Sequence, residues 1–195
     1  THPSFLKDRD TVIEEALEVG VNRMCVTGSD LEESISAYQL AFSLSDILIS
    51  TAGIHPHQAK EFSQNYFSEI KDLLKKENVK AIGETGLDFY RNFSTEEQQK
   101  KSFEMHIETS IELQKPLFLH VRNAHSTFME MLEPVKEKLP KTVVHCFTGT
   151  EEELMDYIEM DFYIGITGWI CDERRGVHLK DLINLIPKDK IMIET

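Results

Sequence analysis

Short apolar runs without helical period alternate along the chain with longer polar segments. Seven runs are rich in β-branched residues, and they occupy Val21–Thr27, Ile47–Ile54, Val79–Glu84, Leu117–Val121, Thr142–Phe147, Phe162–Ile166 and Lys190–Thr195. Continuous apolar runs of this length are typical of parallel strands that are buried on both faces. The pattern therefore predicts seven strands of one parallel sheet.

The segments between these runs carry apolar residues at helical spacing. Phe103, Ile107 and Ile111, for example, fall on one face of a helix. A leading helix is expected at about Asp8–Val19, before the first run. Three helix starts are predicted by capping boxes, in which a hydroxyl and a carboxylate satisfy each other's backbone donors, at Ser29–Glu32, Ser94–Glu97 and Thr150–Glu153.

Strict alternation of strands and helices predicts a parallel α/β fold, either an open doubly wound sheet or a closed barrel. No Gly-x-Gly-x-x-Gly follows a strand, which counts against a dinucleotide-binding sheet. Seven strands are one short of a (β/α)₈ barrel, and the leading helix has no strand before it. We expect residues 1–195 to form a single barrel domain of the TIM type, strands two to eight, in a fragment whose first strand and C-terminal end are missing.

Several predicted strands end in residues that can ligate a metal, namely His55 and His57, Glu84, His120 with Arg122, His145, and Glu194. Barrel enzymes place their active sites at the carboxyl ends of the strands. One such histidine alone is more often a structural residue, but Glu84, His120 and His145 should converge on one point. A carboxylate with two imidazoles suits a divalent ion, and Glu84 could bridge two ions.

Other catalytic devices are missing from the sequence. It has no Gly-x-Ser-x-Gly elbow, no phosphate-binding Gly-x-x-x-x-Gly-Lys loop and no His-Glu-x-x-His helix. A water molecule activated by a bound metal is therefore the simplest nucleophile.

Charge and composition limit the partners. The net charge of −13, from 21 basic and 34 acidic residues, argues against a broad basic face that would hold nucleic acid. Contact with a nucleic acid would have to be local. No apolar run is long enough to span a membrane and no signal peptide is evident, so we expect a cytoplasmic protein. Nothing indicates an obligate protein partner.

Three cysteines, Cys25, Cys146 and Cys171, form an odd set without Cys-x-x-Cys spacing, and we interpret them as reduced buried thiols. Three further histidines, His106, His125 and His178, are interpreted as structural or surface residues.

Four stretches resemble successive motifs of the TatD deoxyribonuclease family, namely Ala81–Phe89, Pro116–Ala124, Val144–Gly149 and Ile191–Thr195. With Gly53–His57, Asn92–Glu96 and Ile164–Gly176 added, the resemblance covers essentially the whole chain. It implies a divalent-cation-dependent DNA exonuclease that trims single strands from the 3′ end, with RNA as an open alternative. The family suggests magnesium, while imidazole ligands suit zinc or manganese.

The resemblance also implies roles for single residues. It places metal ligands at Glu84, His120 and His145, with Glu84 also catalytic. His55 is expected to act in catalysis, and Arg122 to stabilise charge on the phosphoryl group and bind substrate.

Substrate contacts are expected from His57 and Asp88 at the same rim. Arg174 and Arg175, beside Trp169, form a candidate phosphate clamp and base-stacking platform, or else an ordinary solvated loop.

Two departures from the family's pattern bear on activity. Many members carry a His-x-His pair on the first strand, which is absent from this chain. The motif that ends here at Thr195 normally continues into an aspartate. We therefore expect an incomplete site in this chain and full activity only in an intact protein. Two rival hypotheses are an amidohydrolase acting on a small cyclic amide or ester, and a truncated, inactive barrel. Many barrel amidohydrolases use a lysine where this chain has Glu84, which favours the nuclease.

Overall fold

The computed structural model describes residues 3–5, 7–174 and 176–195. One sheet contains seven parallel strands in the order β1 to β7. The strands are β1 Met24–Val26, β2 Leu48–Ala52, β3 Val79–Asp88, β4 Leu117–Arg122, β5 Val143–Val144, β6 Tyr163–Ile166 and β7 Ile191–Ile193. All seven predicted strands are present, and the predicted parallel α/β architecture is confirmed.

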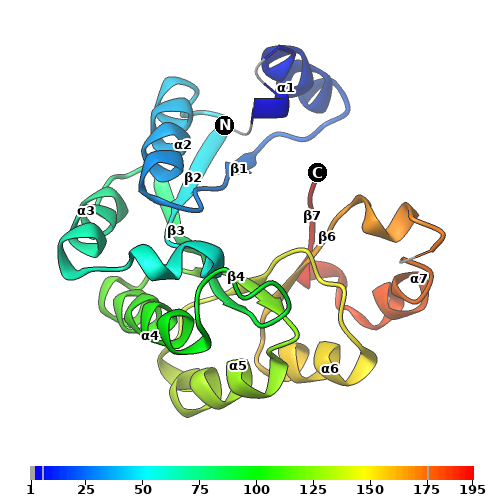
Figure 1. The fold of residues 1–195 in the computed structure, drawn as a ribbon. Helices are drawn as coiled ribbons and strands as arrows, with labels where there is room; N and C mark the ends of the chain where they lie inside the picture. Colours follow the sequence, from blue (N-terminus) through cyan, green and yellow to red (C-terminus); the bar gives the residue numbers. More distant parts are fainter. Residues whose placement is uncertain (1–2, 6, 175) are drawn as a thin grey trace.

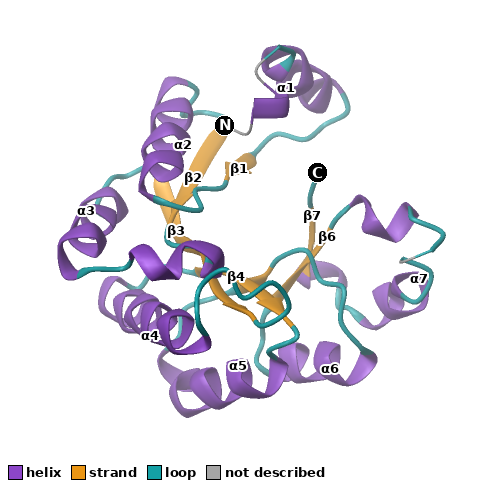
Figure 2. Ribbon diagram, viewed as in Figure 1, coloured by secondary structure: helices purple, strands orange, loops and turns teal. Residues whose placement is uncertain are grey.

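The helices lie along the outer side of the curled sheet, and β1 and β7 form the two ends of the curl (Figures 1 and 2). The α-helices are α1 Arg9–Glu18, α2 Leu31–Ser43, α3 Gln64–Leu74, α4 Glu96–Leu113, α5 His125–Leu132, α6 Glu151–Glu159 and α7 Leu179–Leu182. Short 3₁₀ segments are η1 Pro3–Phe5, η2 Pro56–Glu61, η3 Glu133–Lys138, η4 Gly168–Cys171, η5 Ile183–Leu185 and η6 Lys188–Lys190. Among the helices of the described residues, none is long and apolar enough to cross a membrane.

Strand β3 is longer than the sequence predicted. It continues past Glu84 to Asp88, after a register shift between Ile82 and Thr85. Two glycines make this continuation possible. A Cβ on Gly83 would lie 2.2 Å from the carbonyl oxygen of Phe118, and one on Gly86 would lie 2.0 Å from that of His120. Only glycine permits such a close approach of two backbones, so Glu84 lies within the strand and Asp88 at its end.

Of the three predicted capping boxes, only the one formed by Thr150 and Glu153 is confirmed. The other two predictions were wrong by one residue. Helix α2 is capped by Asp30, and α4 by Thr95 in a capping box with Gln98. Ser94 does not cap α4 because its hydroxyl donates a hydrogen bond to the carbonyl oxygen of His57.

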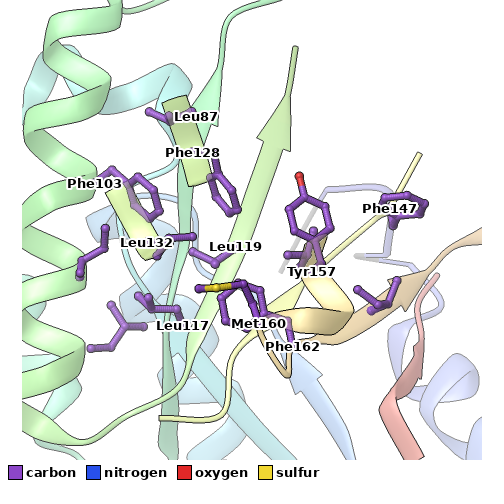
Figure 3. Packing of buried hydrophobic residues seen from close by; sticks show 14 of the residues in the cluster. Leu87, Phe103, Leu117, Leu119, Phe128, Leu132, Phe147, Tyr157, Met160 and Phe162 are labelled. Atoms are coloured by element: carbon purple, nitrogen blue, oxygen red, sulfur yellow. The ribbon is translucent and has the colours of Figure 1, made fainter. Parts of the chain in front are cut away.

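The core extends from α3 to α7, and Figure 3 shows the part of it that packs around β4 and the helices α4, α5 and α6. Phe103 of α4 stacks on Phe128 of α5, with ring centroids 5.4 Å apart, and Tyr157 of α6 contacts Phe128 at 5.9 Å. This packing fixes the outer layer of helices against the strands that carry the candidate site. All three cysteines are free, as predicted, but none is buried as expected: Cys25 and Cys171 are exposed and Cys146 is half-buried.

Candidate metal centre

The Glu84 carboxylate of β3 is the meeting point of three imidazoles, one from the loop after β2, one from β4 and one from directly after β5. Glu84 Oε1 lies 3.2 Å from His55 Nε2 and 3.1 Å from His120 Nδ1. The same oxygen lies 2.7 Å from His145 Nε2. All four side chains are mostly buried. The structure therefore brings Glu84, His120 and His145 together, as the positions of the strands predicted.

His55 joins this group more closely than the sequence analysis expected. His55, Glu84 and His120 each offer a ligand atom, and these atoms lie within 4.8 Å of one another. His55 Nδ1 accepts a hydrogen bond from the backbone nitrogen of His57, which turns Nε2 towards Glu84. Two imidazole nitrogens and a carboxylate oxygen at this spacing can hold a divalent ion, and His145 lies beside them.

Asp88, at the end of β3, pairs with His57 and His120. Its Oδ2 lies 2.8 Å from His57 Nε2 and 3.3 Å from His120 Nε2, and its side chain is 1% exposed. Its Oδ1 accepts hydrogen bonds from the backbone nitrogens of Tyr90 and Arg91. Such a fixed carboxylate orients the imidazole of His120, as partners of metal ligands commonly do.

Glu194 was predicted only as one of several strand-end residues that can ligate a metal, without a specific role. Its Oε2 lies 3.2 Å from His145 Nδ1, and its Oε1 accepts a hydrogen bond from the backbone nitrogen of Cys146. A Cβ on Gly165 of β6 would lie 1.6 Å from Glu194 Oε1, so the glycine makes room for this carboxylate. The position of Glu194 directly after β7 was the available signal.

Replacing Glu194 by glutamine should weaken metal binding. The amide keeps the shape of the side chain but removes the negative charge that stabilises and orients the imidazole of His145. Loss of such a partner typically costs about 10- to 100-fold in affinity. Calorimetric titration with Mn²⁺ measures the change, with Glu137→Gln on exposed η3 as the matched control. Equal affinity of Glu194→Gln and the wild type would show that Glu194 does not act through His145.

The charges in the cluster compensate one another. Burial opposes ionisation of Glu84, but the positive charge of His145 and hydrogen bonds from the imidazoles hold the pKa of Glu84 well below its usual range. Burial likewise opposes protonation of His145, but Glu84 and Glu194 raise its pKa to about 10. The pKa of His120 is also raised, by Asp88 and Glu84 against the effect of burial. Without a metal, protonated imidazoles neutralise the buried carboxylates.

The other predicted substrate contacts lie further out. Arg122, at the end of β4, is exposed, and its guanidinium carbon lies 4.0 Å from the centroid of the Tyr90 ring. Trp169 is 38% exposed on η4, and Arg174 pairs with Asp172 at 3.4 Å. Arg175 lies outside the described residues.

A cavity of about 350 Å³ opens beside the cluster, and its walls include Arg122, Asn123, His145 and the exposed His178. His106 is buried in α4, where Nε2 accepts a hydrogen bond from the backbone nitrogen of Ile54, so its predicted structural role is confirmed. This bond ties α4 to the residue before His55.

Known proteins are similar to this chain over its whole length. Residues 1–195 match a family model described as TatD related DNase. Two relatives named 3'-5' ssDNA/RNA exonuclease TatD, from Citrobacter koseri and Escherichia coli K12, are each 47% identical over 195 residues, which is all of this chain and 75% of each relative.

Two solved structures have the same fold. The first is YJJV, a TatD homologue from Escherichia coli K12, with a TM-score of 0.89 and 25% identity over 99% of this chain and 74% of its own. The second is an uncharacterized amidohydrolase from Saccharomyces cerevisiae, with a TM-score of 0.83 and 27% identity over 96% of this chain and 67% of its own. The chain belongs to the family of TatD-related DNases, and the hydrolase predicted from its motifs is confirmed.

Proposed function

We propose that this protein is a divalent-metal-dependent phosphodiesterase that removes nucleotides from the 3′ end of single-stranded DNA, and also of RNA. The observation that carries the proposal is the buried carboxylate of Glu84, on which three imidazoles converge. The names of relatives at 47% identity support the substrate and the polarity.

The donor set fits a divalent ion. His55, Glu84 and His120 would hold it, with His145 at its side, and when bound it would supply an activated water and neutralise charge on the phosphate. The protein's own groups prepare the centre. Asp88 and Glu194 fix the imidazoles, and His57 lies at the edge where a phosphate can be oriented. Arg122 lies at the same rim as a cation for the phosphoryl oxygens.

Magnesium is proposed as the physiological ion, since it is the ion that the family suggests. Manganese and zinc are the alternatives, because a site rich in imidazoles binds them more readily than magnesium.

We also infer that the seven strands belong to a single (β/α)₈ barrel domain. The consecutive parallel order from β1 to β7 and the curl of the sheet support this assignment (Figure 2).

The polarity of the reaction is testable with blocked substrates. A single-stranded oligonucleotide labelled at the 5′ end should yield a ladder of shortened products. The same oligonucleotide with phosphorothioate linkages at its 3′ end should resist, whereas linkages at the 5′ end should have no effect. Equal protection by either block would contradict 3′-to-5′ trimming.

A second candidate is an amidohydrolase, which is favoured by the likeness of this fold to the amidohydrolase structure from Saccharomyces cerevisiae. The same strand ends can serve both chemistries. Hydrolysis of bis-nitrophenyl phosphate, but not of a panel of cyclic amides and esters, is expected. The reverse preference would favour the second candidate.

Metal binding should weaken as the pH falls. Because the pKa values of His120 and His145 are raised in the metal-free protein, an ion must displace protons from imidazoles in order to bind. The apparent affinity should fall about tenfold per pH unit for each displaced proton between about pH 8 and 6. Calorimetry in two buffers of different ionisation enthalpy counts these protons. A pH-independent affinity would show that the ion binds without displacing protons from the imidazoles.

A further inference from the structure

The loop between β3 and α4, residues 89–95, is held rigidly by buried polar groups. Asp88 accepts hydrogen bonds from the backbone of Tyr90 and Arg91. Gln99, which is fully buried, donates to the carbonyl oxygens of Asp88 and Ser94. Ser94 donates to the carbonyl oxygen of His57 and accepts from the backbone nitrogen of Lys60. The backbone of the loop is thus fixed to the end of β3 and to η2.

The same loop leaves two aromatic side chains in solvent. Tyr90 is 60% exposed and Phe93 is 56% exposed. The Phe93 ring lies 4.8 Å from the ring of His57, nearly perpendicular to it, and His57 is bonded to Asp88. The His57 ring in turn lies 4.2 Å from that of His55. Phe93 is therefore an exposed aromatic ring that contacts His57, and His57 contacts His55, one of the three residues that can hold a metal.

An exposed phenylalanine on a fixed loop contributes little to folding, since its surface stays largely in water. It does provide a preorganised surface for a planar ligand. The net charge of −13 argues against a broad basic face for the phosphate backbone, so binding of a nucleic acid needs another source of affinity. Stacking of bases on aromatic rings supplies it without sequence preference, because every base has a π-face.

We propose that Phe93 is a stacking platform for a nucleobase near the 3′ end of the substrate, with the Tyr90–Arg122 pair as a second stacking surface. This proposal rests on the proposed nuclease function and names how that site holds its substrate. The platform would lie on the loop after β3, and not at Trp169, which the sequence offered as a candidate for this role. Stacking here would position the adjacent phosphodiester at the metal centre.

The test compares substrates with and without bases. Kinetics are measured for the full-length protein on a single-stranded oligonucleotide and on the same oligonucleotide with its last two nucleotides abasic. Phe93→Ala should raise KM about tenfold on the normal substrate, with little change in kcat. It should have almost no effect on the abasic substrate. Phe93→Trp should retain wild-type behaviour, and Phe42→Ala, which removes a 67% exposed ring on α2, is the matched control.

Two results would contradict the proposal that Phe93 stacks on a nucleobase. One is an unchanged KM of Phe93→Ala on the normal oligonucleotide, and the other is an equal rise on both substrates. If the wild type cleaved neither substrate with any metal, the nuclease proposal itself would fail. Fluorescence anisotropy with the same two labelled oligonucleotides would then test the platform through binding affinity. The wild type should bind the oligonucleotide with bases more tightly than the abasic one, and Phe93→Ala should lose this preference.

Discussion

Replacing Glu84 by glutamine should reduce exonuclease activity by about 10³-fold. A metal that supplies several kcal/mol of charge stabilisation accounts for a factor of this size, at about 1.4 kcal/mol per tenfold. Glutamine has nearly the same shape, but it removes the negative charge on which His55, His120 and His145 converge. Both the affinity for the ion and the position of the imidazoles depend on that charge.

Two measurements separate the parts of this effect. Calorimetry of Glu84→Gln should show weak or no binding of Mn²⁺, and the rate of trimming of a labelled oligonucleotide should fall with it. Glu108→Gln, on the exposed face of α4, is the control and should match the wild type. A Glu84→Gln protein that kept its rate within about threefold would exclude Glu84 as a ligand of the ion.

Truncating Phe103 to alanine should reduce the free energy of unfolding by about 3–5 kcal/mol, as is typical of Phe-to-Ala changes in cores. Phe103 is fully buried and stacks on Phe128, so its removal leaves a cavity between α4 and α5. The loss is measured by urea denaturation at equilibrium. The surface control Phe42→Ala should change stability by no more than about 0.5 kcal/mol.

Phe103→Ala should also affect the candidate metal centre. His106 lies one turn after Phe103 on α4 and binds the backbone of Ile54, next to His55. A loosened α4 is therefore expected to weaken metal binding at temperatures where the protein is still folded. If Phe103→Ala lost less than about 1 kcal/mol, the core between α4 and α5 would not be what stabilises this part of the fold.

The strands could be predicted because buried parallel strands consist of continuous apolar, β-branched runs that stand out from the sequence around them. The end of β3 could not. Gly83 and Gly86 interrupt the apolar pattern, yet in three dimensions they allow β3 and β4 to come close and the strand to continue to Asp88. Similarly, Ser94 could not be told from a cap because the partner of its hydroxyl, His57, is distant in sequence.

The site could be predicted in outline, since strand order alone places Glu84, His120 and His145 at one edge of the sheet. The contact of His55 with the same carboxylate oxygen depends on the rotation of its ring, which the backbone of His57 determines. The role of Glu194 depends on space left by Gly165 in the neighbouring strand. Neither relation is visible along the chain.

The most direct test of a metal-dependent nuclease is degradation of a 5′-labelled single-stranded oligonucleotide by the full-length protein. Reactions are run with EDTA, with Mg²⁺ and with Mn²⁺, beside His120→Ala. We expect a ladder of products shortened from the 3′ end that disappears with EDTA, returns when the metal is restored and is absent in the variant. Shortening that persists in EDTA, or no shortening with any metal, would contradict the proposed function.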